Sequence, residues 1–152
     1  MSEQKIPKTL EGRKDLKALT INLFGGLMKS IQNGTESLPA HPDHSAIIVT
    51  NFGIITADVE HIDTEELGTP VGADQMKLNT INMLVKFRDE ALKEWENEIG
   101  PENARLTNDT SIVLLKNATL RPFANPEARF DFDQLALFAD QIVGFTGGES
   151  SE

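Results

Sequence analysis

The sequence predicts an α+β fold: a small, strongly bent antiparallel sheet or barrel, with an N-terminal helix and a long inserted helix. Three observations support this expectation. A helical pattern of apolar residues comes first, short runs rich in β-branched residues follow, and a second long helical pattern divides these runs into two groups. These alternations are too few for a doubly wound α/β fold. With 152 residues, we expect a single α+β domain over residues 1–146 and a disordered tail over 147–152.

The first helix is expected to end before Gly34, because a glycine commonly follows the last turn of a helix. Gly25 and Gly26 weaken its middle by about 1 kcal/mol each relative to alanine, which indicates a kink or a close contact. Its apolar face recurs at three- and four-residue spacing and needs a partner surface. The residues of this predicted face are Leu16, Leu19, Leu23, Leu27 and Ile31, with Phe24 and Met28 beside them.

Two β segments are expected at residues 46–50 and 54–59, either joined by a turn at Gly53 or forming one strand bent there. The second helix is expected over residues 75–99, where it packs against the protein's own sheet or pairs with the same helix of another subunit. A further β segment at residues 110–115 is extended by residues 118–121. The last β residues, 135–139 and 142–145, form either two strands on either side of a turn at Asp140-Gln141 or one continuous bent strand.

Composition excludes several classes of function. The chain has no Cys, which rules out thiol catalysis, cysteine zinc sites and disulfides, and fits a reducing cytoplasm. Its net charge of -10 opposes nucleic-acid binding, which needs a basic surface. Residues 1–40 carry six basic and four acidic residues, so the acid excess belongs to residues 41–152. There is no signal-peptide pattern and no long apolar stretch, so we expect no membrane association.

The β segments resemble, in their order, the Sm-like small barrels. IIVTNFGIITADVEHID is similar to the first motif of that family, TSIVLLKNATLRP to its third strand, and LALFADQIVGF to its second motif. The resemblance implies a barrel that follows an N-terminal helix and assembles into a ring. It does not extend to uridine recognition, because Asp140-Gln141 stands where RNA-binding members usually carry Arg-Gly. In addition, Ser111 lies near the place of their third-strand Asn.

Histidine supplies the candidate metal ligands. His41 and His44 flank a Pro-Asp pair, and His61 lies among acidic residues, so imidazole and carboxylate groups could form a zinc site. The spacing matches no established zinc motif, so we expect a solvated loop and no metal. The acidic segment also lacks the regular offsets of a calcium loop, and we expect it to be solvated. Its carboxylates are Asp58, Glu60, Asp63, Glu65 and Glu66.

Cations beside aromatic residues are the candidate contacts for a nucleotide or another ligand. They are Arg121, Phe123 and Arg129, and the alternative is a loop that covers the end of the barrel. No catalytic motif occurs, so we expect a non-enzymatic cytoplasmic module without a cofactor that forms homo-oligomers or binds a protein partner. Two alternatives remain open: an RNA-binding Sm-like ring protein, and a metal-dependent hydrolase that uses His41, His44 and His61.

Overall fold

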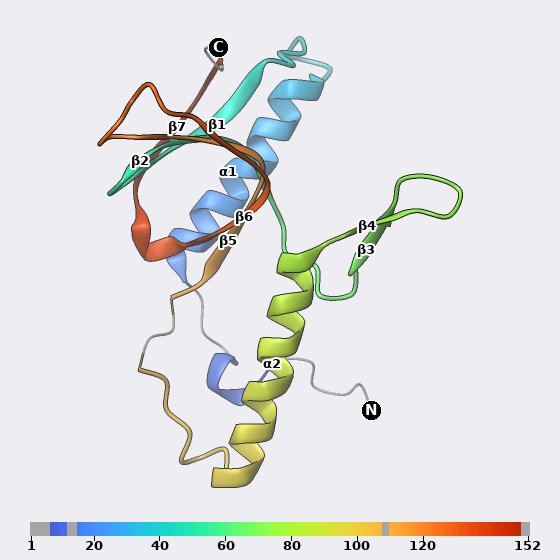
Figure 1. Ribbon diagram of the computed structural model, residues 1–152, viewed down its shortest axis with the longest axis vertical. Coiled ribbons are helices and arrows are strands. Elements are labelled where there is room, and N and C mark those ends of the chain that lie inside the picture. The colour runs from blue at the N-terminus through green and yellow to red at the C-terminus, as the bar shows by residue number, and fades with distance from the viewer. Residues whose placement is uncertain (1–6, 12–14, 108–109, 150–152) are drawn as a thin grey trace. The chain divides into compact units, whose positions relative to one another are not determined.

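The computed structural model describes residues 7–11, 15–107 and 110–149, and the chain divides into two compact units (Figure 1). The smaller unit comprises Met1–Lys14 and Ile62–Asp109, and the larger comprises Asp15–His61 and Thr110–Glu152. The sequence predicts one domain over residues 1–146. Residues 147–149, which were predicted to belong to a disordered tail, lie in the last strand. Residues 150–152, the rest of the predicted tail, lie outside the described residues.

The larger unit holds one helix and a five-stranded antiparallel sheet, so the α+β class is confirmed. The strand order is β6-β5-β2-β1-β7. β6 and β7 are its two edges and do not pair with each other, so the sheet is open and the alternative of a closed barrel is wrong. The elements of this unit are α1 (Leu16–Asn33), β1 (His44–Thr50), β2 (Gly53–Glu60), β5 (Ile112–Pro122), β6 (Phe130–Phe138), the short 3₁₀ turn η2 (Ala139–Gln141) and β7 (Ile142–Glu149).

The core of this unit lies between α1 and one face of the sheet (Figure 1). Ile48, Ile55 and Leu115 from three neighbouring strands are fully buried there, and Ile21 of α1 packs against them. The helix can approach the sheet closely because Gly25 has no side chain: a Cβ at Gly25 would lie 2.7 Å from both the Cβ and the carbonyl oxygen of Val59.

The prediction that the leucines of α1 form its buried face is wrong. Leu16 is 74% exposed, Leu19 40%, Leu23 67% and Leu27 55%. Ile31 does pack against the core, as do Phe24 and Met28, which were expected beside this face. The buried side of α1 is formed instead by Ala18, Ile21, Gly25 and Met28. Small residues occupy the side of α1 that faces β2, because the helix can approach this strand closely only where no large side chain lies between them.

Asp15 anchors the start of α1 to the sheet. Its Oδ1 accepts a hydrogen bond from the amide of Ala18 at 3.1 Å, and its Oδ2 accepts one from the amide of Ser111 at 3.1 Å. The Ala18 bond is the largest cause that lowers the pKa of Asp15; burial opposes it, and the Ser111 bond adds to the lowering. One carboxylate therefore caps the helix and fixes the residue that precedes β5.

Residues 110–115 and their expected extension over 118–121 belong largely to the single strand β5. Asn117 has φ 52°, a left-handed conformation that asparagine tolerates better than most residues. The register between β2 and β5 shifts between Thr56 and Asp58, next to Asn117. This bulge increases the local twist of the sheet and keeps the strand continuous, so a break in sequence pattern does not become a break in the strand.

The smaller unit contains one long helix, a two-stranded hairpin and a short 3₁₀ helix. The expected helix over residues 75–99 begins later, because residues 76–78 pair with residues 68–70. Asn79 and Asn82, both buried, each donate a side-chain hydrogen bond of 2.9 Å to the carbonyl oxygen of Glu66. The elements are η1 (Lys8–Leu10), β3 (Gly68–Pro70), β4 (Met76–Leu78) and α2 (Thr80–Ile99). Over the described residues, neither long helix has the apolar length needed to cross a membrane.

Glu96 of α2 holds η1 within the smaller unit. Its buried carboxylate accepts hydrogen bonds from the amides of Lys8 at 3.0 Å and Thr9 at 2.9 Å, and another from the Thr9 hydroxyl. Burial raises the pKa of Glu96, but the hydrogen bonds from Thr9 and Lys8 outweigh it, so the pKa lies below its ordinary value of 4.5. The ionised form is therefore the one that stabilises this unit.

We expect the attachment of η1 to weaken in acid. Because the folded-state pKa of Glu96 is lowered, its contribution is present above the unfolded-state pKa and is lost as the pH falls through the lower folded-state value. Glu96→Gln should weaken the attachment at neutral pH and remove most of this acid dependence. Fluorescence of Trp95, the only Trp, measures it during an acid titration. Glu98→Gln, at an exposed position of the same helix, is the control and should titrate like the wild type.

Candidate functional site

The two edge strands of the larger unit expose apolar side chains next to unpaired backbone. β6 has nine residues and β7 has eight, and among the residues that the structure describes each pairs with a neighbouring strand on one side only. A free strand edge offers N–H and C=O groups that can pair with another chain. Large apolar side chains stand exposed along both edges: Phe130, Phe132 and Phe138 on β6, and Val143 and Phe145 on β7.

The edges differ in charge. β6 carries Asp131 and Asp133 among its aromatic residues, whereas β7 is uncharged until Glu149. Two copies that joined through β6 alone would bring these aspartates toward each other, and like charges directly opposite destabilise a strand pair. Pairing β6 of one copy with β7 of another avoids this repulsion. The arrangement of charge therefore favours a head-to-tail contact.

The candidate ligand contacts lie near one end of the sheet. Phe123, which is exposed, donates a backbone hydrogen bond of 3.0 Å to the carbonyl oxygen of Phe52, and Arg121 lies opposite Ile54 in the β2–β5 pair. This brings Phe52 beside the predicted residues. Phe52 is not among the residues predicted from the sequence, because nothing in the linear pattern marks it as a neighbour of Phe123.

Arg129 differs from the other candidates because an acid neutralises it. Its Nε lies 3.1 Å from Oδ1 of Asp131, the residue two positions along. The Thr119 hydroxyl donates to Asp131 at 2.8 Å, and this bond and Arg129 hold the pKa of the Asp131 carboxyl below its ordinary value of 3.8. The paired guanidinium is less able to attract a phosphate. RNA contact at this end of the sheet remains a prediction.

Two of the three histidines lie side by side. The rings of His41 and His44 are 5.5 Å apart between centroids, and Nδ1 of His44 is buried without a hydrogen-bond partner. His61 directly follows β2. Across the part of the chain that the structure describes, no group of three or more His, Asp or Glu residues is placed to hold a metal ion.

The acidic segment does not act as one cluster. Asp58 and Glu60 belong to β2 of the larger unit, where Asp58 accepts from Asn117 Nδ2 at 3.2 Å and Glu60 pairs with Lys29 at 2.8 Å. Asp63 belongs to the smaller unit, and its Oδ1 accepts from the amide of Glu65 at 2.9 Å in a local turn. Asp58, Glu60 and Asp63 thus each have a partner within their own unit.

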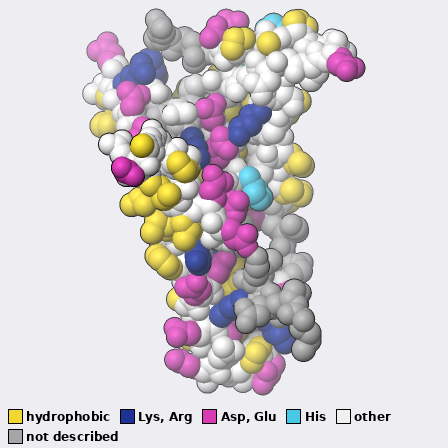
Figure 2. All heavy atoms as spheres, turned by 90° about the vertical axis from the view of Figure 1, so that its right-hand side faces the viewer, with side chains coloured by type: hydrophobic (Ala, Val, Ile, Leu, Met, Phe, Trp, Pro, Cys, Tyr) yellow, Lys and Arg dark blue, Asp and Glu magenta, His cyan; other side chains and the backbone are white. Residues whose placement is uncertain are grey.

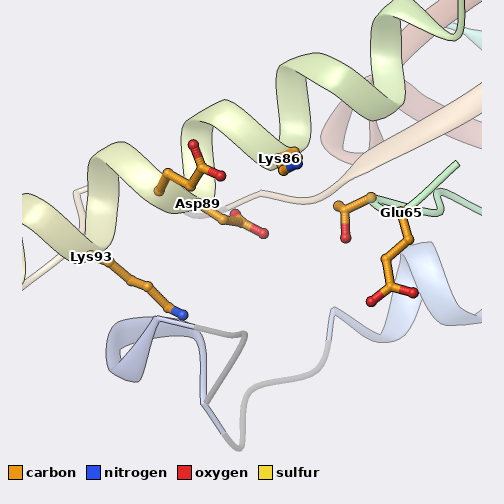
Figure 3. A pocket seen from close by; sticks show the side chains of 6 residues that line it. Glu65, Lys86, Asp89 and Lys93 are labelled. Atoms are coloured by element: carbon orange, nitrogen blue, oxygen red, sulfur yellow. The ribbon is translucent and has the colours of Figure 1, made fainter. Parts of the chain in front are cut away.

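The smaller unit also has an open groove of about 420 Å³ beside α2 (Figure 3). Its volume falls within the range of ligand pockets, but such pockets are mostly apolar and this one is lined by charges of both signs. Asp89 and Lys93 project from α2, and Glu65 comes from the preceding loop (Figure 3). The mixture gives the groove no preference for a ligand of one sign. The lining residues are Thr64, Glu65, Lys86, Asp89, Glu90 and Lys93.

A second apolar surface belongs to the smaller unit. Figure 2 shows hydrophobic side chains gathered next to a row of acidic ones. Apart from Ile99 at the end of α2, the exposed large apolar residues described in this unit lie in the hairpin and the first half of α2: Val71, Met76, Leu78, Leu84 and Phe87. Exposed patches of this kind commonly mark interaction sites.

Comparisons with protein-family models, with curated proteins and with solved structures gave no match to this chain. Its function therefore has to be argued from the surfaces themselves. Among them, the strand edges combine apolar side chains with free backbone groups. They are the surfaces best suited to bind another protein chain.

Proposed function

We propose that this protein is an oligomerising module of the cytoplasm, in which β6 of one copy pairs with β7 of the next. One observation carries the proposal: the five-stranded sheet ends on two free edges, and both expose large apolar side chains. Natural proteins usually protect such edges with charges, proline or a covering element. Pairing in a second chain would satisfy the backbone groups and bury the apolar residues together.

The two edges suit each other in length and charge. Strands of nine and eight residues can pair along nearly their whole length. The acidic residues of β6 would face an almost uncharged strand, so the pairing avoids like charges that isologous β6 pairing would bring together. A head-to-tail contact of this kind gives a ring when its rotation closes and a filament when it does not.

The order of elements also supports assembly. One helix precedes five strands, and a short turn, η2, separates the last two strands, as the resemblance to Sm-like barrels implies. The part of the smaller unit over Ile62–Asp109 is inserted between β2 and β5, which are the second and third strands of the sheet along the chain. Ring assembly is what that resemblance implies for the protein. The lack of Cys fits the proposed cytoplasmic location.

Light scattering coupled to gel filtration tests the proposal. We expect the wild type to form particles of several 16.7 kDa subunits at micromolar concentration. Phe130→Lys on β6 and Val143→Lys on β7 should each give smaller particles, because a lysine on an edge opposes strand pairing. Phe123→Lys, at an exposed loop position off both edges, is the matched control and should keep the wild-type mass. A wild-type monomer, or edge variants of unchanged mass, would refute strand-edge assembly.

A further inference from the structure

We infer that α1 forms a second contact between copies of this chain, in which the exposed side of α1 packs against the same side of α1 from another copy. This contact is separate from the β6–β7 pairing and does not depend on it. The exposed side, called here the α1 outer face, is uncharged along its middle, and the exposed Lys17 and Lys29 flank it. It consists of Leu16, Leu19, Thr20, Leu23, Gly26, Leu27, Ser30 and Asn33.

The hydroxyl groups of the α1 outer face donate hydrogen bonds to the backbone of their own helix. The Thr20 hydroxyl donates to the carbonyl oxygen of Leu16 at 2.8 Å, and the Ser30 hydroxyl donates to that of Gly26 at 3.2 Å. Both hydroxyls thus have partners within the helix and need none outside it. The surface offered to a partner is mainly leucine side chains and small residues.

The two lysines of α1 are bound to the larger unit itself. Lys17 Nζ donates to the carbonyl oxygen of Ile142 at 2.8 Å, and Lys29 Nζ pairs with Glu60 at 2.8 Å. α1 contains no acidic residue, although the chain as a whole has a net charge of -10. Two identical acidic chains repel each other over most of their surfaces. They can approach at the α1 outer face without bringing like charges into contact, which favours a second copy over a partner selected by charge.

Gly26 leaves a gap in the α1 outer face that a side chain of another helix can fill. Gly25 is required by the fold because a Cβ would meet Val59, whereas a Cβ at Gly26 would meet nothing within 4 Å. A glycine inside a helix is destabilising relative to alanine, and the packing of a single chain does not account for Gly26. Residues three and four apart are neighbours on a helix, so Leu23 and Ser30 border the gap at Gly26. A leucine from a second α1 fits such a gap.

A two-fold contact satisfies both helices at once. In an isologous pair, the residue that inserts into the partner also receives the partner's equivalent residue. With α1 helices crossing near Gly26, Leu23 of each copy enters the gap of the other, and the small residue lets the helix axes approach closely. This contact would bury leucines that a single chain leaves exposed.

Single-cysteine variants test the contact directly, because the chain has no Cys of its own. Under mild oxidation, we expect Leu23→Cys or Leu27→Cys, on either side of Gly26, to form covalent dimers. The control is Ser37→Cys, which places an equally accessible thiol in the loop after α1. Dimer formation at the control rate by both α1 variants would overturn the inference, as would a wild-type chain that stays monomeric at micromolar concentration.

Mass measurements separate this contact from strand-edge assembly. In the Val143→Lys background, we expect a dimer held by α1, and addition of Leu23→Lys should convert it to a monomer. Gly26→Ala should weaken this dimer by about tenfold in dissociation constant, because an added methyl group overpacks the gap. Gly26→Ala should not lower the melting temperature of the dilute protein. An unchanged or higher melting temperature would exclude misfolding as the cause of the weaker dimer. A Val143→Lys dimer that Leu23→Lys leaves intact would refute the α1 contact and leave the strand-edge proposal untouched.

Discussion

Gly25→Val is expected to destabilise the larger unit by about 2–3 kcal/mol, which corresponds to a melting temperature lower by roughly 10 °C. The added Cβ would lie 2.7 Å from both the Cβ and the backbone oxygen of Val59. Backbone cannot yield as a flexible side chain does, so α1 must move away from β2 and lose contacts along its length. Thermal unfolding followed by circular dichroism measures the change.

The adjacent glycine supplies the control. Gly26→Ala adds a methyl group where nothing lies within 4 Å. In dilute protein it should stabilise α1 by about 0.5–1 kcal/mol, because alanine has the higher helix propensity. The two neighbouring substitutions therefore have opposite signs. If Gly25→Val and Gly26→Ala changed the melting temperature equally, the close approach of α1 to β2 at Gly25 would be contradicted.

Leu115→Ala should be the most damaging truncation in the chain, costing about 2–5 kcal/mol. Leu115 is 0% exposed and lies in the middle of the sheet, opposite Val59 of β2 and Leu135 of β6. Its removal leaves a cavity that rigid neighbouring strands cannot fill. Urea unfolding of dilute protein gives the change in free energy of unfolding.

Leu23→Ala is the matched comparison, because the sequence pattern and the structure disagree about this residue. The helical spacing predicts Leu23 in a buried face, but it is 67% exposed. We expect a change within about 0.5 kcal/mol in dilute protein, as for most surface substitutions. A loss at Leu23 as large as that at Leu115 would show that α1 buries its leucine side within the monomer.

The fold class could be predicted because periodicity reports local structure. The runs rich in β-branched residues that became β1 and β2 are typical of strands, whichever surface each residue faces. The buried side of α1 could not be predicted, because hydrophobicity ranks Leu23 above Gly25 and Ala18. What decides the orientation is how closely the helix can approach Val59, and this distance depends on the sheet.

The functional surfaces were only partly predictable for a similar reason. The candidate Arg129 is identifiable from its sequence, but its neutralisation by Asp131 depends on side-chain geometry. Edge strands cannot be recognised along the chain either, because β7 looks like any other strand until its pairing with β1 places it at the border. The resemblance to Sm-like barrels predicts assembly, but which strands form the sheet edges became visible only from the strand order.

Mixing two blocked copies tests head-to-tail assembly most directly. One copy carries Phe130→Lys, which leaves only β7 free to pair, and the other carries Val143→Lys, which leaves only β6; Leu23→Lys in both removes the α1 contact. We predict that each copy alone is a monomer of 16.7 kDa and that an equimolar mixture forms a dimer by light scattering. A mixture that remains monomeric, or a single blocked copy that dimerises alone, would contradict the pairing of β6 with β7.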